Sequence, residues 1–148
     1  MSASGRIRRA WPSDRPVLLS LWRRAVEATH AFLSPAEIDL LEPEVAELLS
    51  TSDAIEVIEA QGAVLGFALV QDDRLEALFI DPGAHRQGWG RRLLRHAGNR
   101  GARSVEVNEE NGGARAFYEA HGCVVTGRTS HDSAGRPWPV LTLNIPSL

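Results

Sequence analysis

The chain has 148 residues, the usual size of one domain, and 43% of them are hydrophobic while 24% are charged. Sixteen Lys and Arg against nineteen Asp and Glu give a formal charge of -3, which argues against broad attraction to nucleic acid or an anionic membrane. No stretch approaches the roughly 20 apolar residues of a membrane-spanning helix, and the single cysteine, Cys123, excludes an intramolecular disulfide. We therefore expect one cytoplasmic domain over residues 1–148, with no nucleic-acid and no membrane partner.

The first part of the chain predicts a short strand followed by two helices. Residues 6–11 alternate weakly in polarity, and Ser13 or Asp14 after them can cap a helix. An apolar stripe at helical spacing follows, and a second helix is expected over 35–49. Pro43 falls inside this second helix, which predicts that the helix is short, kinked or split.

The remainder predicts three strands joined by hairpins, and then helices that alternate with strands. The periodicity changes from helical to strand-like at Ala54, and turn residues separate the segments. The expected elements are strands over 54–60, 63–70 and 75–80, a helix over 88–100, a strand over 104–108, a helix over 112–121, and strands over 123–129 and 138–145. The fold class is α/β in the α+β sense: a mixed, mostly antiparallel sheet of six to seven strands with about four flanking helices.

The stretch "AHRQGWGRRLL", residues 84–94, lies between a buried strand and an amphipathic helix. Free N–H groups at a helix start, together with the helix dipole, form an anion-binding site. Gly88 and Gly90 lack the Cβ atoms that would hold a phosphate away from the backbone, and arginines flank them. The other interpretation of these glycines is a tight turn with solvated arginines.

Two familiar phosphate-binding loops do not fit the residues that follow the glycines. A Walker loop requires Lys and then Ser or Thr directly after its last glycine, where this chain has Arg91 and Arg92. The dinucleotide fingerprint requires a third glycine where Leu93 stands, although Glu106 lies near the acidic position expected further on. A nucleotide-binding enzyme is therefore a weaker alternative.

The stretch "FIDPGAHRQGWG" resembles the acetyl-CoA loop of the GCN5-related N-acetyltransferases, the GNAT superfamily, written Arg/Gln-x-x-Gly-x-Gly/Ala after a strand. His85 stands where that family has Arg or Gln. A second block, "NEENGGARAFYEAHGC", resembles the family's Asn-x-x-Ala-x-x-x-Tyr-x-x-x-Gly stretch, with Asn111, Ala114, Tyr118 and Gly122 in the matching places. Further motifs look most like the YjaB-type branch of small bacterial acetyltransferases.

The resemblance implies an N-acetyltransferase that moves an acetyl group from acetyl-CoA to a primary amine of a small molecule, amino acid or peptide by direct attack. It implies no metal, and a monomer or homodimer. The residues that it implies for CoA binding are Leu78, Phe79 and Ile80 for the pantetheine arm, His85, Arg86, Gln87, Gly88, Trp89, Gly90 and Arg91 for the pyrophosphate, and Asn111, Ala114 and Phe117 on the next helix. The alternative function is a non-catalytic sensor module that binds acyl-CoA.

Tyr118 and Glu76 are the candidates for the proton transfers of this reaction. A phenol of pKa about 10 can protonate a thiolate of pKa about 8.5 to 9, and the counterpart of Tyr118 in the family lies near the CoA sulfur. Glu76 is expected to share a strand face with Leu78 and Ile80, where desolvation would raise its pKa toward that of a useful base.

Other residues compete for the role of base, namely Glu109, Glu110, His30 and His131. The alternative for Glu76 is an ion pair with Arg74 or Arg103. In the family, acceptor specificity lies between the first two helices and in the final hairpin. The acceptor-pocket candidates in those segments are Thr29, His30, Phe32 and Trp138.

Overall fold

The computed structural model describes residues 5–146, and within them seven strands and four α-helices form one mixed sheet with helices on both faces. The strands are β1 (Arg6–Arg9), β2 (Ile55–Ala60), β3 (Ala63–Gln71), β4 (Arg74–Ile80), β5 (Ser104–Asn108), β6 (Val124–Thr129) and β7 (Val140–Asn144). The helices are α1 (Arg15–Thr29), α2 (Pro35–Thr51), α3 (Trp89–Asn99) and α4 (Gly112–Ala120), with 3₁₀ turns η1 (Pro12–Asp14) and η2 (Pro82–Ala84). The predicted fold class is confirmed.

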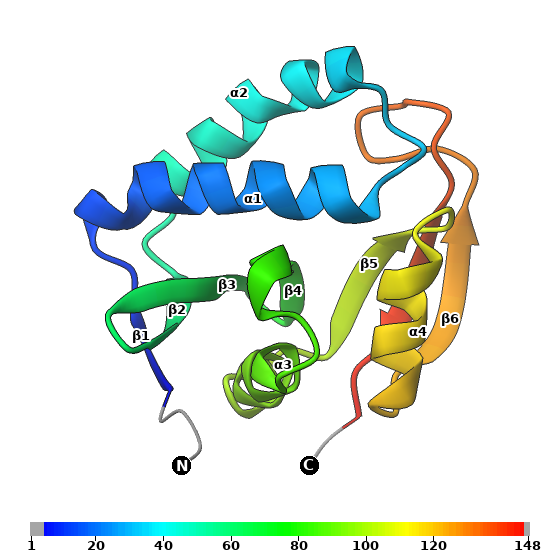
Figure 1. Cartoon of the computed structure of the whole chain (residues 1–148). Helices are drawn as coiled ribbons and strands as arrows, with labels where there is room; N and C mark the ends of the chain where they lie inside the picture. The colour runs from blue at the N-terminus through cyan, green and yellow to red at the C-terminus, as the bar shows by residue number, and fades with distance from the viewer. Residues whose placement is uncertain (1–4, 147–148) are drawn as a thin grey trace.

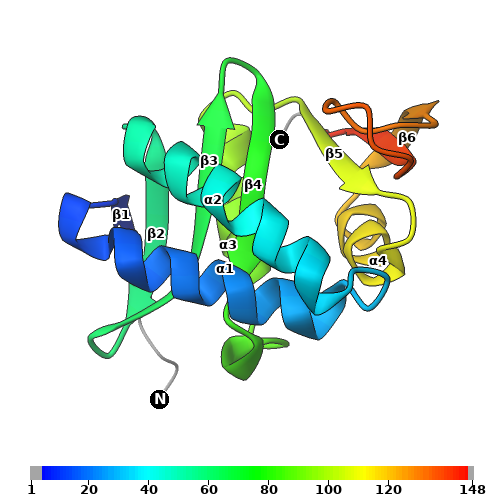
Figure 2. The ribbon, with the colours of Figure 1, turned by 90° about the horizontal axis from the view of Figure 1, so that it is seen from above.

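The sheet has the strand order β1-β2-β3-β4-β5-β7-β6, and β4 with β5 is the parallel pair. This pair is short, because only Arg74 with Ser104 and Leu75 with Val105 are in register within the described residues. Beyond these positions β4 continues to Ile80 without pairing to β5, and Figures 1 and 2 show the two strands diverging. We call this gap the β4–β5 opening.

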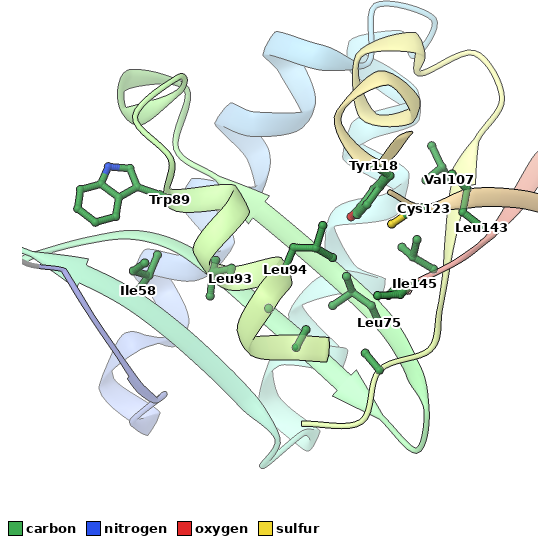
Figure 3. Close-up of a cluster of buried hydrophobic side chains, with 14 of the residues drawn as sticks. Ile58, Leu75, Trp89, Leu93, Leu94, Val107, Tyr118, Cys123, Leu143 and Ile145 are labelled. Carbon is green, nitrogen blue, oxygen red and sulfur yellow. The ribbon is translucent and has the colours of Figure 1, made fainter. Parts of the chain in front are cut away.

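Two separate hydrophobic cores cover the two faces of the sheet. Helices α1 and α2 lie over one face, and α3 and α4 lie against the other (Figure 1). The α1–α2 core includes Leu18, Leu21 and Phe67, whereas the α3–α4 core includes Leu93 and Leu143 (Figure 3). None of the helices within residues 5–146 combines the length and the apolar character that crossing a bilayer requires.

Helix α2 begins as predicted but does not end or divide at Pro43. Ser34 and Glu37 form a capping box, in which the Glu37 N–H donates to Ser34 Oγ at 3.1 Å and the Ser34 N–H donates to the Glu37 carboxylate at 2.9 Å. The helix then runs unbroken through Pro43, so the prediction of a short or split helix is wrong. Pro43 removes one backbone N–H donor from the helix. The helix continues because Ile38 and Leu49 on either side of Pro43 are buried, and this packing stabilises the helix.

Asp14 does not cap α1 with its side chain, contrary to the prediction. It occupies the position before the helix, but its carboxylate accepts the Trp11 N–H at 2.6 Å and the Arg8 guanidinium at 2.9 Å. The side chain is buried, and the hydrogen bond from Arg8 holds the pKa of Asp14 below its ordinary value. The first strand ends at Arg9 rather than at residue 11, and the chain then turns so that Asp14 can pair with Arg8.

Candidate functional site

The loop between β4 and α3 presents unpaired amides at a helix start. Gly88 stands before the first residue of α3 with φ of 87°, and Arg86 also has a positive φ of 63°. The first helical hydrogen bond runs from the Arg92 N–H to the Gly88 carbonyl at 3.1 Å. The N–H groups of residues 89–91 therefore have no acceptor within the helix. Together with the positive end of the helix dipole, they fit a phosphate group.

The two glycines of this loop serve different physical purposes. A Cβ at Gly88 would meet no atom within 4 Å, so this glycine is required by its left-handed backbone. A Cβ at Gly90 would lie 3.2 Å from the ring of Phe117, so this glycine lets α3 approach α4. The sequence interpretation gave both glycines the same reason, access for a phosphate, and the structure supports a packing reason for Gly90.

Several predicted loop residues use their side chains within the protein. Trp89 is 5% exposed and belongs to the α3–α4 core (Figure 3). Its indole N–H donates to Gln87 Oε1 at 2.9 Å. The His85 ring donates from Nε2 to the Ile80 carbonyl at 3.2 Å. These residues shape the loop and leave mainly their backbone for a ligand, whereas Arg86 and Arg91 are exposed and carry the positive charge.

A cleft of 470 Å³ lies between α3 and the end of α4, next to this loop. Its lining residues are Arg91, Leu94, Arg95 and Gly98 of α3, with Ala120, His121, Ile145 and Pro146. The sequence interpretation included Arg91 but missed Arg95 and His121. The spacing of Arg91 and Arg95, four residues apart on one helix face, was the available signal for the first of these.

Glu76 lies at a β-bulge that the regular alternation of the strand did not predict. The register with β3 passes from Leu75 to Ala77, so Glu76 is the extra residue. Leu75 is buried in the α3–α4 core against which Leu78 and Ile80 also pack, so the bulge brings Leu75 to the face of these two residues. The Glu76 carboxylate is 3.7 Å from the Arg74 Nε, and its side chain is 32% exposed.

Tyr118 is buried in the α3–α4 core beside Cys123 (Figure 3). Its ring meets that of Phe117 edge to face, with centroids 5.1 Å apart. Desolvation by burial, with a smaller contribution from Cys123, raises the pKa of Tyr118 well above its ordinary value. The hydroxyl is therefore protonated at neutral pH and can donate a proton or a hydrogen bond.

Asn111 contacts the segment that follows α1. Its side-chain oxygen accepts the Ala114 N–H at 3.1 Å and caps α4, while its Nδ2 lies 3.2 Å from His30 Nε2. The other ring nitrogen of His30 is 2.8 Å from Thr29 Oγ1. Both polar atoms of the buried Asn111 side chain have protein partners, so this side chain joins the start of α4 to the segment after α1.

The remaining acceptor candidates come together from two distant segments. Phe32 and Trp138 both pack against the α1–α2 core. Arg136, near Trp138, lies over its ring at 5.3 Å and pairs with Glu44 of α2 at 3.1 Å, which holds the final hairpin against this helix. The predicted acceptor residues thus lie on the α1–α2 side of the sheet, and Tyr118 lies on the other.

The structure argues against Glu109 and His30 as competing bases. The Arg128 guanidinium hydrogen-bonds the Glu109 carboxylate and holds its pKa below the ordinary value, so Glu109 is a weak base. Both ring nitrogens of His30 have hydrogen-bonding partners, and His131 is exposed. Among residues 5–146 no three His, Cys, Asp or Glu side chains gather in a way that could hold a metal ion.

A short parallel pair beside a helix start with free amides fits the binding of an acyl-CoA. The sequence profile of the GNAT acetyltransferase domain matches residues 51–124, a range from the end of α2 to the start of β6 that includes the loop and α4. The chain belongs to the GNAT family of acetyltransferases, whose donor is acetyl-CoA, and it is an acyltransferase.

Within this family the chain is similar to two bacterial proteins named peptidyl-lysine N-acetyltransferase YjaB. It is 38% identical to that of Salmonella typhimurium over 141 residues, or 95% of this chain and 97% of the relative. It is 36% identical to that of Escherichia coli over 138 residues, or 93% of this chain and 94% of the relative. The predicted resemblance to the YjaB-type branch is confirmed.

Solved structures show the same fold. The solution structure of the apo form of YjaB from Escherichia coli matches with a TM-score of 0.91 and 35% identity, over 98% of this chain and 99% of that chain. The PaiA N-acetyltransferase from Thermoplasma acidophilum, solved in complex with coenzyme A, matches with a TM-score of 0.71 at 17% identity, over 95% of this chain and 99% of that chain. The second likeness concerns the fold alone.

Proposed function

We propose that this protein transfers the acetyl group of acetyl-CoA to the side-chain amine of a lysine in a peptide or protein. The β4–β5 opening is the observation that carries the proposal, because it lies between the face with the anion-binding loop and the face with the aromatic acceptor residues. Relatives named peptidyl-lysine N-acetyltransferases support a lysine acceptor. A small amine or free amino acid is the other acceptor class.

The residues around the opening fit the parts of acetyl-CoA. The amides at the start of α3 and the flanking Arg91 would hold the pyrophosphate. The edge of β4 over residues 78–80 has no partner in β5, and its peptide groups would bind the amides of the pantetheine arm. The cleft lined by Arg91, Arg95 and His121 would hold the phosphorylated adenosine end.

The proposed transfer forms one bond and breaks one bond. The neutral amine of the acceptor attacks the thioester carbonyl, the C–N bond forms, and the C–S bond breaks to release the thiolate of CoA. Tyr118 would give its proton to that sulfur. The apolar site that disfavours the phenolate also disfavours the thiolate, so the proton transfer does not depend on the ordinary pKa of Tyr118 alone.

We assign the removal of the amine proton to Glu76, acting through water. Glu76 is the first residue of β4 beyond the last pair with β5, at the base of the opening. Its partial exposure gives water access, and its distance of 3.7 Å from Arg74 leaves the carboxylate free to accept further hydrogen bonds. A backbone N–H on the unpaired edge of β4 would polarise the carbonyl of the thioester.

The deciding experiment combines the protein with acetyl-CoA and a panel of amines while free thiol is followed. A lysine-containing peptide should release thiol faster than free lysine or a small amine, and the same peptide with an Nε-acetylated lysine is the control. Thiol release with small amines alone would contradict the lysine-peptide acceptor. Binding of CoA without transfer to any amine would favour the sensor alternative, and stabilisation by ATP or NAD rather than CoA would favour the nucleotide-binding one.

A further inference from the structure

A continuous chain of hydrogen bonds links the start of α4 to the end of α1. The Ala114 N–H donates to Asn111 Oδ1 at 3.1 Å, and Asn111 Nδ2 lies 3.2 Å from His30 Nε2. His30 Nδ1 lies 2.8 Å from Thr29 Oγ1, which in turn donates to the Ala25 carbonyl at 2.7 Å. The backbone groups at the two ends of this hydrogen-bond series, the Ala114 N–H and the Ala25 carbonyl, therefore determine which atoms between them carry hydrogen.

The donor and the acceptor of each hydrogen bond in this series follow from the groups at its two ends. The capping bond requires the oxygen of the Asn111 side chain to face the Ala114 N–H, so the amide nitrogen faces His30 and donates. The Thr29 hydroxyl donates its one hydrogen to the Ala25 carbonyl, so its oxygen must accept a hydrogen bond from His30 Nδ1–H. His30 is then neutral, with the proton on Nδ1 and the lone pair of Nε2 directed at Asn111.

A protonated His30 ring does not fit this arrangement. Its Nε2–H would face the amide hydrogens of Asn111, two donors against each other. Rotating the Asn111 amide by half a turn would not help, because its nitrogen would then face the Ala114 N–H. Within the described residues, the ring hydrogen-bonds the side chains of Thr29 and Asn111 and packs against Phe32, and none of these three side chains titrates. Burial lowers the pKa of His30, in agreement with the neutral form.

We propose that His30 is a positioning residue, which in its neutral Nδ1-protonated form holds the acceptor segment at residues 30–33 against the CoA-binding helix α4. His30 is not available as a general base, because both of its ring nitrogens are hydrogen-bonded within the protein. Phe32 packs beside the His30 ring, with centroids 5.3 Å apart. The position of His30 therefore sets the position of Phe32, the apolar residue of the acceptor segment. The acceptor role rests on the proposed function, whereas the tautomer and the link do not.

Ring nitrogen NMR tests the link without any activity measurement. Two-bond ¹H–¹⁵N correlation spectra at pH 7 should show one histidine with a protonated Nδ1 and a bare Nε2, and its signals should vanish in His30→Gln. Thr29→Val removes the hydroxyl that accepts from Nδ1 while Asn111 still donates to Nε2, so the same tautomer should persist with a shifted Nδ1 signal. A parent His30 that is protonated on Nε2, or charged, at pH 7 would overturn the inference even if acetyl transfer is as proposed.

Two amide variants of His30 test whether its hydrogen bond to Asn111 affects the KM for the acceptor peptide. The side-chain oxygen of His30→Gln reaches the place of Nε2 and can accept from Asn111, whereas the side chain of His30→Asn reaches only the place of Nδ1. His30→Gln should keep the KM for the lysine peptide within about threefold of the parent, and His30→Asn should raise it about tenfold, with equal Kd for CoA in both. Equal KM values in the two variants would overturn the positioning role.

The pH dependence gives a readout that a merely structural residue would not move. Acidification below the ordinary histidine pKa of about 6.5 should raise the acceptor KM of the parent as His30 takes up a proton and its bond to Asn111 is lost. His30→Gln, which has nothing to protonate at that position, should show a smaller rise. Parallel profiles in the two proteins would contradict the inference, because the rise would then come from the amine or another group.

Discussion

Gly90 lies directly against the ring of Phe117, so that a Cβ atom at position 90 would come within 3.2 Å of two ring carbons. This contact joins the first turn of α3 to α4. It places the helix start that presents the free amides next to the helix that carries Tyr118. The separation of these two helices is thus set by a missing side chain.

Gly90→Val should destabilise the protein through this contact. The added methyl groups would force the Phe117 ring or the whole of α3 to move, and overpacking of this kind costs about 1–3 kcal/mol in the free energy of unfolding. Urea denaturation measures the change. The double variant with Phe117→Leu should recover part of the loss, and an unchanged unfolding midpoint in Gly90→Val would show that the contact is not tight.

Gly88→Val should weaken the binding of CoA tenfold or more. The φ of 87° at this position is costly for a β-branched residue, and relaxing it would turn the amides of the loop away from the phosphate site. Isothermal titration calorimetry with CoA gives the affinity. Gly88→Asn is the matched variant, since asparagine adopts this backbone more readily and should lose less. Parent-like affinity in Gly88→Val would refute the assignment of the loop.

Arg95→Gln should reduce the preference for CoA over dephospho-CoA. If the cleft between α3 and α4 holds the 3′-phosphate, the affinity for CoA should fall about fivefold while that for dephospho-CoA stays the same. Arg100→Gln, at the residue that follows α3 and pairs with Glu56 of β2, is the control for the loss of one positive charge. Equal losses for both ligands, or in both variants, would place the adenosine end elsewhere.

Tyr118→Phe should slow acetyl transfer and leave CoA binding intact. The variant keeps the ring in the α3–α4 core and removes only the proton donor, whose contribution is typically about 10²- to 10⁴-fold. Single-turnover rates with the best amine are the appropriate measurement, because product release can mask the chemical step. An unchanged rate would reduce Tyr118 to a packing residue, and an equal loss of CoA affinity would assign it to binding.

Asp14 should make the stability of the protein depend on pH in the acid range. Its pKa is lower in the folded state, mainly because of the hydrogen bond from Arg8, so the folded state binds fewer protons than the unfolded one as the pH falls below about 4. The stabilisation is complete above the unfolded pKa and is lost as the pH falls through the folded one.

Asp14→Asn tests this dependence directly. The variant should lose about 2 kcal/mol of unfolding free energy at pH 7, because Arg8 loses its charged hydrogen bonds to Asp14 and keeps only those to Glu59 and the Arg9 carbonyl. Its stability should then fall less steeply than that of the parent between pH 5 and pH 3, as followed by urea denaturation. Glu27→Gln, which alters an exposed ion pair with Arg23, is the control and should change little. Parallel acid profiles would show that Asp14 does not titrate with folding.

Signals within a few residues of one another were sufficient to predict the order of helices and strands. The capping pair Ser34 and Glu37 marks the start of α2, and the polarity change at Ala54 marks the hairpins. The glycine loop and the block around Tyr118 identified the family from spacing alone. Strand ends were less accurate, as in the last strand, which begins at Val140 rather than at residue 138. The hairpin turns and the cap of α2 are local, so the sequence by itself determined them, whereas Asp14 is drawn from its predicted cap by Arg8 of the preceding strand.

Relations between distant segments were decided only by the tertiary structure. His30 and Asn111 are 81 residues apart, and nothing near either of them predicts a hydrogen bond between them. The bulge at Glu76 and the short pairing of β4 with β5 also escaped the sequence interpretation. Register, bulges and side-chain partners depend on how whole helices pack on the sheet, and that packing sums many weak contacts whose partners are not neighbours along the chain.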